Sequence, residues 1–228
     1  MTYADKQLII AAERRDFDSI KKAIDNGANV NATNNNGWSA FLQKSETALH
    51  SVAYHGNLRC LRLLLEAGAH VDVADTALLQ TPLHYAASRG HLECTRALID
   101  SNANINARDE HGASALHRGA EEGRTECLRA LIEAGADINA TDQWGWSALH
   151  WATSNDHFGS VLALLQQSEI DPHLKTTRHW RDIDPGASAL DIAQKNGHYA
   201  IAQALQEVIS SQSLQMERGT QKRQRHLL

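Results

Sequence analysis

The stretch that decides the fold is Thr81-Pro82-Leu83-His84, because close copies of it recur along the chain at an almost constant period. The copies are Thr47-Ala48-Leu49-His50, Ser114-Ala115-Leu116-His117, Ser147-Ala148-Leu149-His150 and the more distant Ser188-Ala189-Leu190-Asp191. Successive tetrapeptides are separated by 34, 33, 33 and 41 residues. A nearly fixed period of this length is typical of proteins built from stacked repeats.

A second marker recurs between the tetrapeptides and keeps the same phase. Its copies are Gly27-Ala28-Asn29-Val30-Asn31, Gly68-Ala69-His70-Val71-Asp72, Asn102-Ala103-Asn104-Ile105-Asn106 and Gly135-Ala136-Asp137-Ile138-Asn139. Because two independent markers stay in step, the repeat organises the chain as a whole.

Each repeat predicts two short helices followed by a turn. In the best copy, Thr81 is a good N-cap and Pro82 suits the first helical position, where a missing N–H costs nothing. Gly90 ends the first helix, apolar residues at helical spacing over 92–99 predict the second, and residues 108–112 suit a turn. Neither helix buries enough apolar surface alone, so the repeats must stack into an elongated solenoid.

The period, the Thr-Pro-Leu-His motif and the segment Gly-Ala-Asp-Ile-Asn-Ala at 135–140 resemble the ankyrin repeat. The resemblance implies an all-α solenoid of helix-turn-helix units, each followed by a β-hairpin or loop, in a curved stack with capping end repeats. We expect an ankyrin repeat domain over 1–209, with repeats at about 5–37, 47–80, 81–113, 114–146, 147–187 and 188–209. Insertions are expected at 39–46 and 173–186, followed by a mobile basic C-terminal tail over 210–228.

Thirteen histidines suggest a metal site, but their positions argue against one. The four motif histidines, His50, His84, His117 and His150, occupy one position in successive repeats, and packed helices lie about 8–10 Å apart. Nitrogens that share a zinc ion must lie much closer together. The resemblance implies instead that these imidazoles hydrogen-bond around the helix start and the neighbouring hairpin. By the same argument, we expect Cys60, Cys94 and Cys127 to be buried and unpaired, and we expect no metal or cofactor.

Composition and charge exclude other classes of protein. No stretch approaches the roughly 18 consecutive apolar residues of a membrane span, and a net charge of −5 argues against a nucleic-acid groove. Three cysteines favour a reducing compartment, so we expect a cytoplasmic monomer; Lys222-Arg223-Gln224-Arg225 leaves nuclear import open. Motifs of common enzyme classes are absent from the sequence, so we expect a non-catalytic protein.

The tryptophans mark where the repeats differ, and these differences point to recognition. Trp38 precedes Ser39 at the start of the first insertion, and Trp146 precedes the motif residue Ser147. Trp144 lies at a hairpin tip, Trp151 follows a motif His and Trp180 lies in the longer insertion. The resemblance implies that such positions face outward or across a concave partner-binding groove. Large aromatic side chains and arginines dominate interaction hot spots. The candidate partner-binding residues are therefore Trp144, Trp146, Trp151, Tyr85, Arg118, Arg89, Arg108, His111, Trp180 and Trp38, with Tyr85, Arg118 and Trp151 forming a row.

We expect the chain to be an adaptor that binds a protein or peptide, and Trp146→Ala with Trp151→Ala to abolish capture without changing melting. A regulatory or inhibitory module that blocks a target through its inserted loops remains an alternative, including a bacterial effector that acts on host proteins. A packing alternative also remains for the aromatic residues: Trp144, Trp146 and Trp180 could stack on one another and hold the long loop. The positions of Asn106 and Asn139 resemble a hydroxylation pattern of ankyrin repeats, although hydrogen bonding within the hairpins is the favoured explanation for them.

Overall fold

The structure is a computed structural model that describes residues 1–34 and 46–225, with side chains described up to residue 214 outside that gap. The described residues form six antiparallel pairs of helices. The pairs are α1 (Tyr3–Glu13) with α2 (Phe17–Asp25), α3 (Ala48–Tyr54) with α4 (Leu58–Glu66), α5 (Pro82–Arg89) with α6 (Leu92–Asp100), α7 (Ala115–Glu121) with α8 (Thr125–Glu133), α9 (Ala148–Ser154) with α10 (Phe158–Leu165), and α11 (Ala189–Asn196) with α12 (Tyr199–Arg225).

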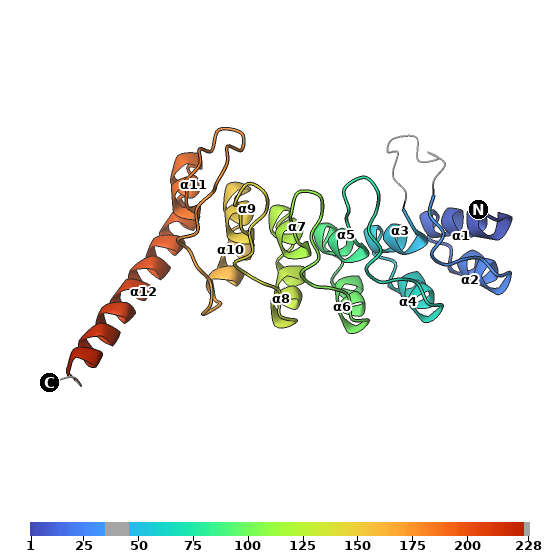
Figure 1. Ribbon diagram of the computed structural model, residues 1–228, viewed down its shortest axis with the longest axis horizontal. Coiled ribbons are helices and arrows are strands. Elements are labelled where there is room, and N and C mark those ends of the chain that lie inside the picture. The colour runs from blue at the N-terminus through green and yellow to red at the C-terminus, as the bar shows by residue number, and fades with distance from the viewer. Residues whose placement is uncertain (35–45, 226–228) are drawn as a thin grey trace.

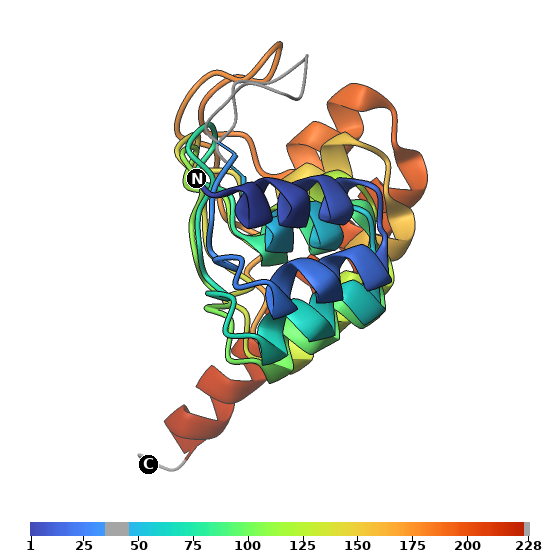
Figure 2. The same cartoon turned by 90° about the vertical axis from the view of Figure 1, so that its right-hand side faces the viewer.

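The pairs stack side by side into a solenoid, as Figure 1 shows. First helices contact first helices from α1 to α11, and second helices contact second helices from α2 to α12. The loops between pairs protrude together on one side of the stack (Figure 2), and the described loops carry only isolated β-bridges instead of strands. The predicted all-α solenoid is confirmed. No helix in the described part of the chain combines the length and apolarity that a bilayer crossing requires.

Each motif histidine joins its own helix start to the loop of the next repeat. The Nδ1 atoms accept the backbone N–H of the Thr or Ser three residues earlier, at 3.1–3.2 Å. The Nε2 atoms lie 3.0–3.1 Å from the carbonyl oxygens of Gln80, Ala113, Ala140 and Leu174. Because a carbonyl only accepts, Nε2 carries the proton and each ring is a neutral imidazole. The structural role implied by the resemblance is therefore confirmed.

The turn inside each helix pair needs a left-handed residue. Gly90 supplies it with φ 77°, and a Cβ there would lie 2.9 Å from the Arg124 side chain of the next repeat. Asp156 occupies the equivalent position in the fifth pair with φ 58°, a conformation that Asp adopts more readily than most residues. The turns thus fix the close approach between neighbouring pairs.

The expectation of a tail that begins after the last helix, at residue 210, is wrong, because α12 continues to Arg225. Ile201 and Leu205 are buried where α12 packs on α10 and α11, and Gln212 Nε2 donates to the Ile170 carbonyl at 3.4 Å. Residues 210–225 contain no proline and are rich in Gln, Lys, Arg and Glu, which are good helix formers. The first turns of α12, which pack on the solenoid, start the helix. The later residues continue it although they form no apolar face. Figure 1 shows α12 extending away from the stack.

Acid is expected to destabilise the solenoid between about pH 6.5 and pH 4. Burial lowers the pKa of His117 and of His150 to about 4, and it also lowers the pKa values of His50 and His84. The unfolded chain, with histidine pKa values of about 6.5, binds more protons in this window, so the free energy of unfolding falls as the pH falls. For His117 alone the loss is on the order of 3 kcal/mol. Thermal melting followed by circular dichroism from pH 7 to pH 4.5 measures it.

The control is His179→Gln, which removes a histidine whose side chain is 73% exposed instead of a buried motif histidine. His117→Gln should lower the melting temperature at pH 7 and flatten its fall with acid. A melting temperature that stays constant from pH 7 to pH 4.5 would contradict the neutral-imidazole account.

Candidate partner-binding surface

Three aromatic side chains from successive loops meet along the tips of the loops. The Trp144 ring lies 5.2 Å from the His111 ring and 4.4 Å from the Trp180 ring, measured between centroids. All three side chains are half-buried. His111, Trp144 and Trp180 are called the aromatic ridge below.

The longer insertion brings Trp180 to this ridge from a distant part of the chain. The Thr177 N–H donates to the Trp144 carbonyl at 2.8 Å, which ties the insertion to the preceding loop. Trp180 and Ile183 then pair as an antiparallel bridge, and Ile183 is buried. The Trp180 ring also contacts Trp151 edge-on at 5.4 Å. The insertion is thus packed against the fourth and fifth repeats through aromatic contacts.

The expectation that Trp146, Trp151 and Tyr85 face outward is wrong. Their exposed fractions are 0%, 5% and 6%. The Trp146 ring packs on Trp151 at 4.7 Å, and its Nε1 atom finds no hydrogen-bond acceptor among the described residues. The packing alternative is therefore supported in part: Trp144 stacks with Trp180, whereas Trp146 pairs with Trp151. Because both side chains are buried, we now expect Trp146→Ala with Trp151→Ala to lower the melting temperature rather than leave it unchanged.

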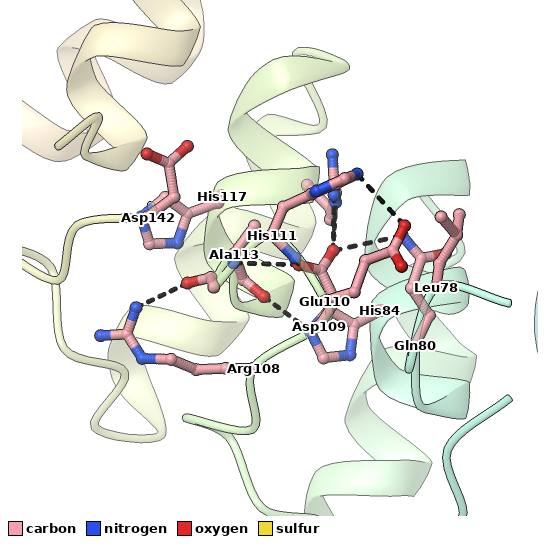
Figure 3. A network of polar contacts seen from close by, with 12 residues as sticks. Leu78, Gln80, His84, Arg108, Asp109, Glu110, His111, Ala113, His117 and Asp142 are labelled. Carbon is pink, nitrogen blue, oxygen red and sulfur yellow. Dashed lines mark hydrogen bonds and ion pairs between the residues drawn. The ribbon is translucent and has the colours of Figure 1, made fainter. Parts of the chain in front are cut away.

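Tyr85, Arg118 and Trp151 occupy equivalent positions, but each turns into the loop before its own helix. Tyr85 Oη donates to Asp75 Oδ2 at 3.1 Å, Arg118 Nε to Asp109 Oδ2 at 2.8 Å, and Trp151 Nε1 to Asp142 Oδ2 at 2.9 Å. The other carboxylate oxygen, Oδ1, accepts two backbone N–H groups of the loop tip in each case. These three acids, Asp75, Asp109 and Asp142, form a carboxylate ladder that shapes the loops. Figure 3 shows the middle rung around Asp109.

Sequence reasoning missed the carboxylate ladder, although a signal was present. Asp75, Asp109 and Asp142 recur at spacings of 34 and 33 residues, in step with the tetrapeptides. A residue that recurs with the period serves the scaffold. The residue after each motif histidine varies in type, yet Tyr, Arg and Trp are all donors. The shared property at that position is therefore the ability to donate a hydrogen bond to the ladder.

Asp109 and Asp142, the middle and last acids of the ladder, differ in the charge of their side-chain partners. Burial raises the pKa of Asp109, but the guanidinium of Arg118 outweighs this effect, so the net pKa lies below the usual value. Asp142 meets only neutral N–H donors in the hydrogen bonds that hold it, and burial raises its pKa. The Asp109 side chain is fully buried and that of Arg118 is 16% exposed, so this pair is largely shielded from water.

The arginines expected to select a partner are largely engaged within the solenoid. Arg118 also donates to Glu121 at 2.9 Å, and Arg108 donates to the carbonyls of Gly112 and Thr141 at 2.6 and 2.7 Å. Arg89 is exposed, and its guanidinium lies 4.0 Å from the centre of the Tyr54 ring. Arg89 and Tyr54 help to line a cavity of about 300 Å³ on the first helices, together with Gln80, Tyr85, Ser88, Arg118, Glu121 and Glu122.

Other expected residues have structural positions or fall outside the description. Trp38 lies outside the described residues. Asn106 Oδ1 and Asn139 Oδ1 accept the N–H groups of Asp137 and Asp171 in the next loop, so both asparagines bridge neighbouring repeats. The three cysteines are buried and unpaired as predicted, and burial raises their pKa values, for Cys94 to about 11. Within the described ranges, no three His, Cys, Asp or Glu side chains converge as metal ligands would.

Arg118→Met is expected to destabilise the protein by about 3 kcal/mol at pH 7, because it leaves the buried Asp109 carboxylate without its cation. The cost should shrink as the pH falls toward 4, since an unpaired buried carboxyl has a raised pKa and takes up a proton. Urea denaturation at pH 7 and pH 4.5, with wild type at each pH, measures the change. Arg118→Trp is the matched control: it copies Trp151 above Asp142, keeps a donor and should lose less. Equal costs for the two variants would refute this role for Arg118.

Comparison with known families agrees with the geometry. The family model described as ankyrin repeats (3 copies) matches residues 8–109, 49–142 and 116–214, which overlap and span nearly all of the chain. No curated protein matches the sequence. Ankyrin repeats generally mediate protein–protein interactions. With the repeat period, the helix pairs and the family match in agreement, the chain belongs to the ankyrin repeat family.

Proposed function

We propose that this chain is a non-catalytic adaptor that binds a protein or peptide through its loop tips and the adjoining concave face of the first helices. The observation that carries the proposal is the aromatic ridge, where Trp144 and Trp180 are held rigidly yet remain partly open to solvent. Tryptophan is enriched at the energetic centres of interfaces. Partly exposed indoles favour aggregation unless a partner covers them. Trp146 and Trp151 act beneath the ridge as supports.

Rigidity is the mechanism that we propose for binding. Each ridge residue is fixed by contacts within its own repeat and to its neighbours: Trp144 N–H donates to Asp142 at 2.9 Å, and Gln143 N–H donates to the His111 carbonyl at 2.9 Å. A surface that is ordered before its partner arrives loses little conformational entropy on association. We further propose a monomer in a reducing compartment such as the cytoplasm, which three unpaired thiols support.

An inhibitory module is the second candidate, and one observation favours it. The insertion over 173–186 contributes Trp180 to the ridge and carries exposed charged side chains on both sides of it. Such a loop could cover a target's site. Under this alternative, the chain should block an activity of its captured partner, whereas an adaptor should leave that activity intact.

Trp144→Ala with Trp180→Ala is expected to reduce partner capture at least tenfold. The solenoid should stay folded, because both side chains are only half-buried. The measurement is an affinity pull-down quantified by mass spectrometry, with circular dichroism on the same samples. Phe158→Ala serves as the matched control, since Phe158 is 41% exposed on a second helix and should not affect capture.

Trp146→Ala is expected to lower the free energy of unfolding by about 3–5 kcal/mol, which is the usual cost of truncating a buried tryptophan. A ridge variant that captures every wild-type partner at full yield would contradict the proposed function. Retained capture by the folded fraction of Trp146→Ala would agree with a supporting role.

A further inference from the structure

We propose that the partner presents an acidic peptide segment with an apolar anchor, in which the anchor packs on Trp144 and Trp180 and carboxylates pair with Arg178 and Arg181. This inference rests on the proposed function and names the chemistry of the partner. It follows from which charges around the ridge are already neutralised and which are not.

The acidic groups beside the ridge already have partners. Asp184 lies 3.2 Å from His179, and Asp182 lies 3.5 Å from the Lys195 ammonium group. Glu110 lies 3.5 Å from His111 Nε2, on the ridge itself. Lys195 reduces the capacity of Asp182 to attract a basic partner, whereas the two histidines neutralise Asp184 and Glu110 only when their rings are protonated.

The two arginines of the insertion, in contrast, have no acidic partner in the described part of the chain. Arg178 and Arg181 are exposed, and neither forms an ion pair within the part of the chain that the structure describes. The Arg178 N–H donates to the Trp144 carbonyl at 3.3 Å, so the backbone of Arg178 lies beside that of Trp144. Arg181 directly follows the other indole and lies at the tip between the bridged residues Trp180 and Ile183. Two exposed arginines without an ion pair among the described residues thus lie close along the backbone to the two tryptophans of the ridge.

The conformation of Arg181 supports a role for its side chain. Its φ is 52°, in the left-handed region that glycine or asparagine occupies with less strain, and it is the first residue of a two-residue tip. An arginine there places a permanent cation at an exposed two-residue tip. Planar guanidinium groups bind carboxylates with two parallel hydrogen bonds, which gives both affinity and direction.

An acidic peptide fits this surface better than a nucleic acid does. Nucleic-acid binding needs many neutralised phosphates, and this chain has 27 acidic against 22 basic residues. Two arginines beside an apolar pair match a short peptide with a few carboxylates around one large apolar side chain. The ridge supplies buried contact area, and the arginines supply selectivity against basic sequences.

The test is selection of random twelve-residue peptides displayed on phage, followed by fluorescence anisotropy with the synthetic peptides that the full-length protein enriches. Enriched peptides should combine Asp or Glu with a nearby Leu, Ile, Phe or Trp. Arg178→Glu with Arg181→Glu should weaken their binding at least tenfold. The matched control is Arg14→Glu with Arg62→Glu, which changes the net charge equally at exposed positions far from the ridge and should alter affinity less than twofold.

The outcomes separate this inference from the proposed function. If Trp144→Ala with Trp180→Ala abolishes binding but the ridge charge reversal does not, the proposed function stands and the acidic partner is wrong. Enrichment of basic or uncharged peptides would also overturn the acidic partner. If the folded tryptophan variant binds every enriched peptide as well as wild type does, both proposals fail. Tight binding of a labelled single-stranded RNA oligonucleotide that the charge reversal abolishes would assign the arginines to a different class of partner.

Discussion

The solenoid depends on the hydrogen bond from each motif imidazole to a carbonyl oxygen in the next loop. A helix pair of this size cannot bury its apolar face alone, so every repeat needs its neighbours. The imidazole orients each repeat relative to the next, because Nδ1 caps its own helix while Nε2 binds the following loop. The ring does this only when neutral, and burial keeps it neutral by lowering its pKa. Loop positions, and therefore the surface formed by their tips, follow from this bond.

The carboxylate ladder holds the loop tips in a similar way, through hydrogen bonds that recur in successive repeats. Asp75, Asp109 and Asp142 each gather two backbone N–H groups and one side-chain donor, although the donor is a phenol, a guanidinium or an indole. A position that differs between repeats can therefore serve the scaffold when its chemistry is equivalent. We propose that selectivity for a partner lies with the residues that have no counterpart in other repeats, above all Trp180, Arg178 and Arg181.

The sequence was sufficient to predict the fold, because two markers in phase specify the repeats without knowledge of any contact. It also predicted the unpaired cysteines, since these occupy equivalent positions in successive repeats. It could not predict the burial of Trp146 and Trp151. Trp146 packs on Trp151, and Trp151 also contacts Trp180, which belongs to an insertion with no periodic signal. The continuation of α12 was missed for a different reason: its last turns have helix propensity without an apolar stripe.

Hydroxyl-radical footprinting of the tryptophans, resolved to single residues by mass spectrometry, tests the central claim most directly. That claim separates recognising side chains from supporting ones within a single aromatic cluster. Trp144 and Trp180 should oxidise readily in the folded protein, whereas Trp146 and Trp151 should oxidise only after unfolding. Protection of all four residues in the native state, or rapid oxidation of Trp146, would contradict the account.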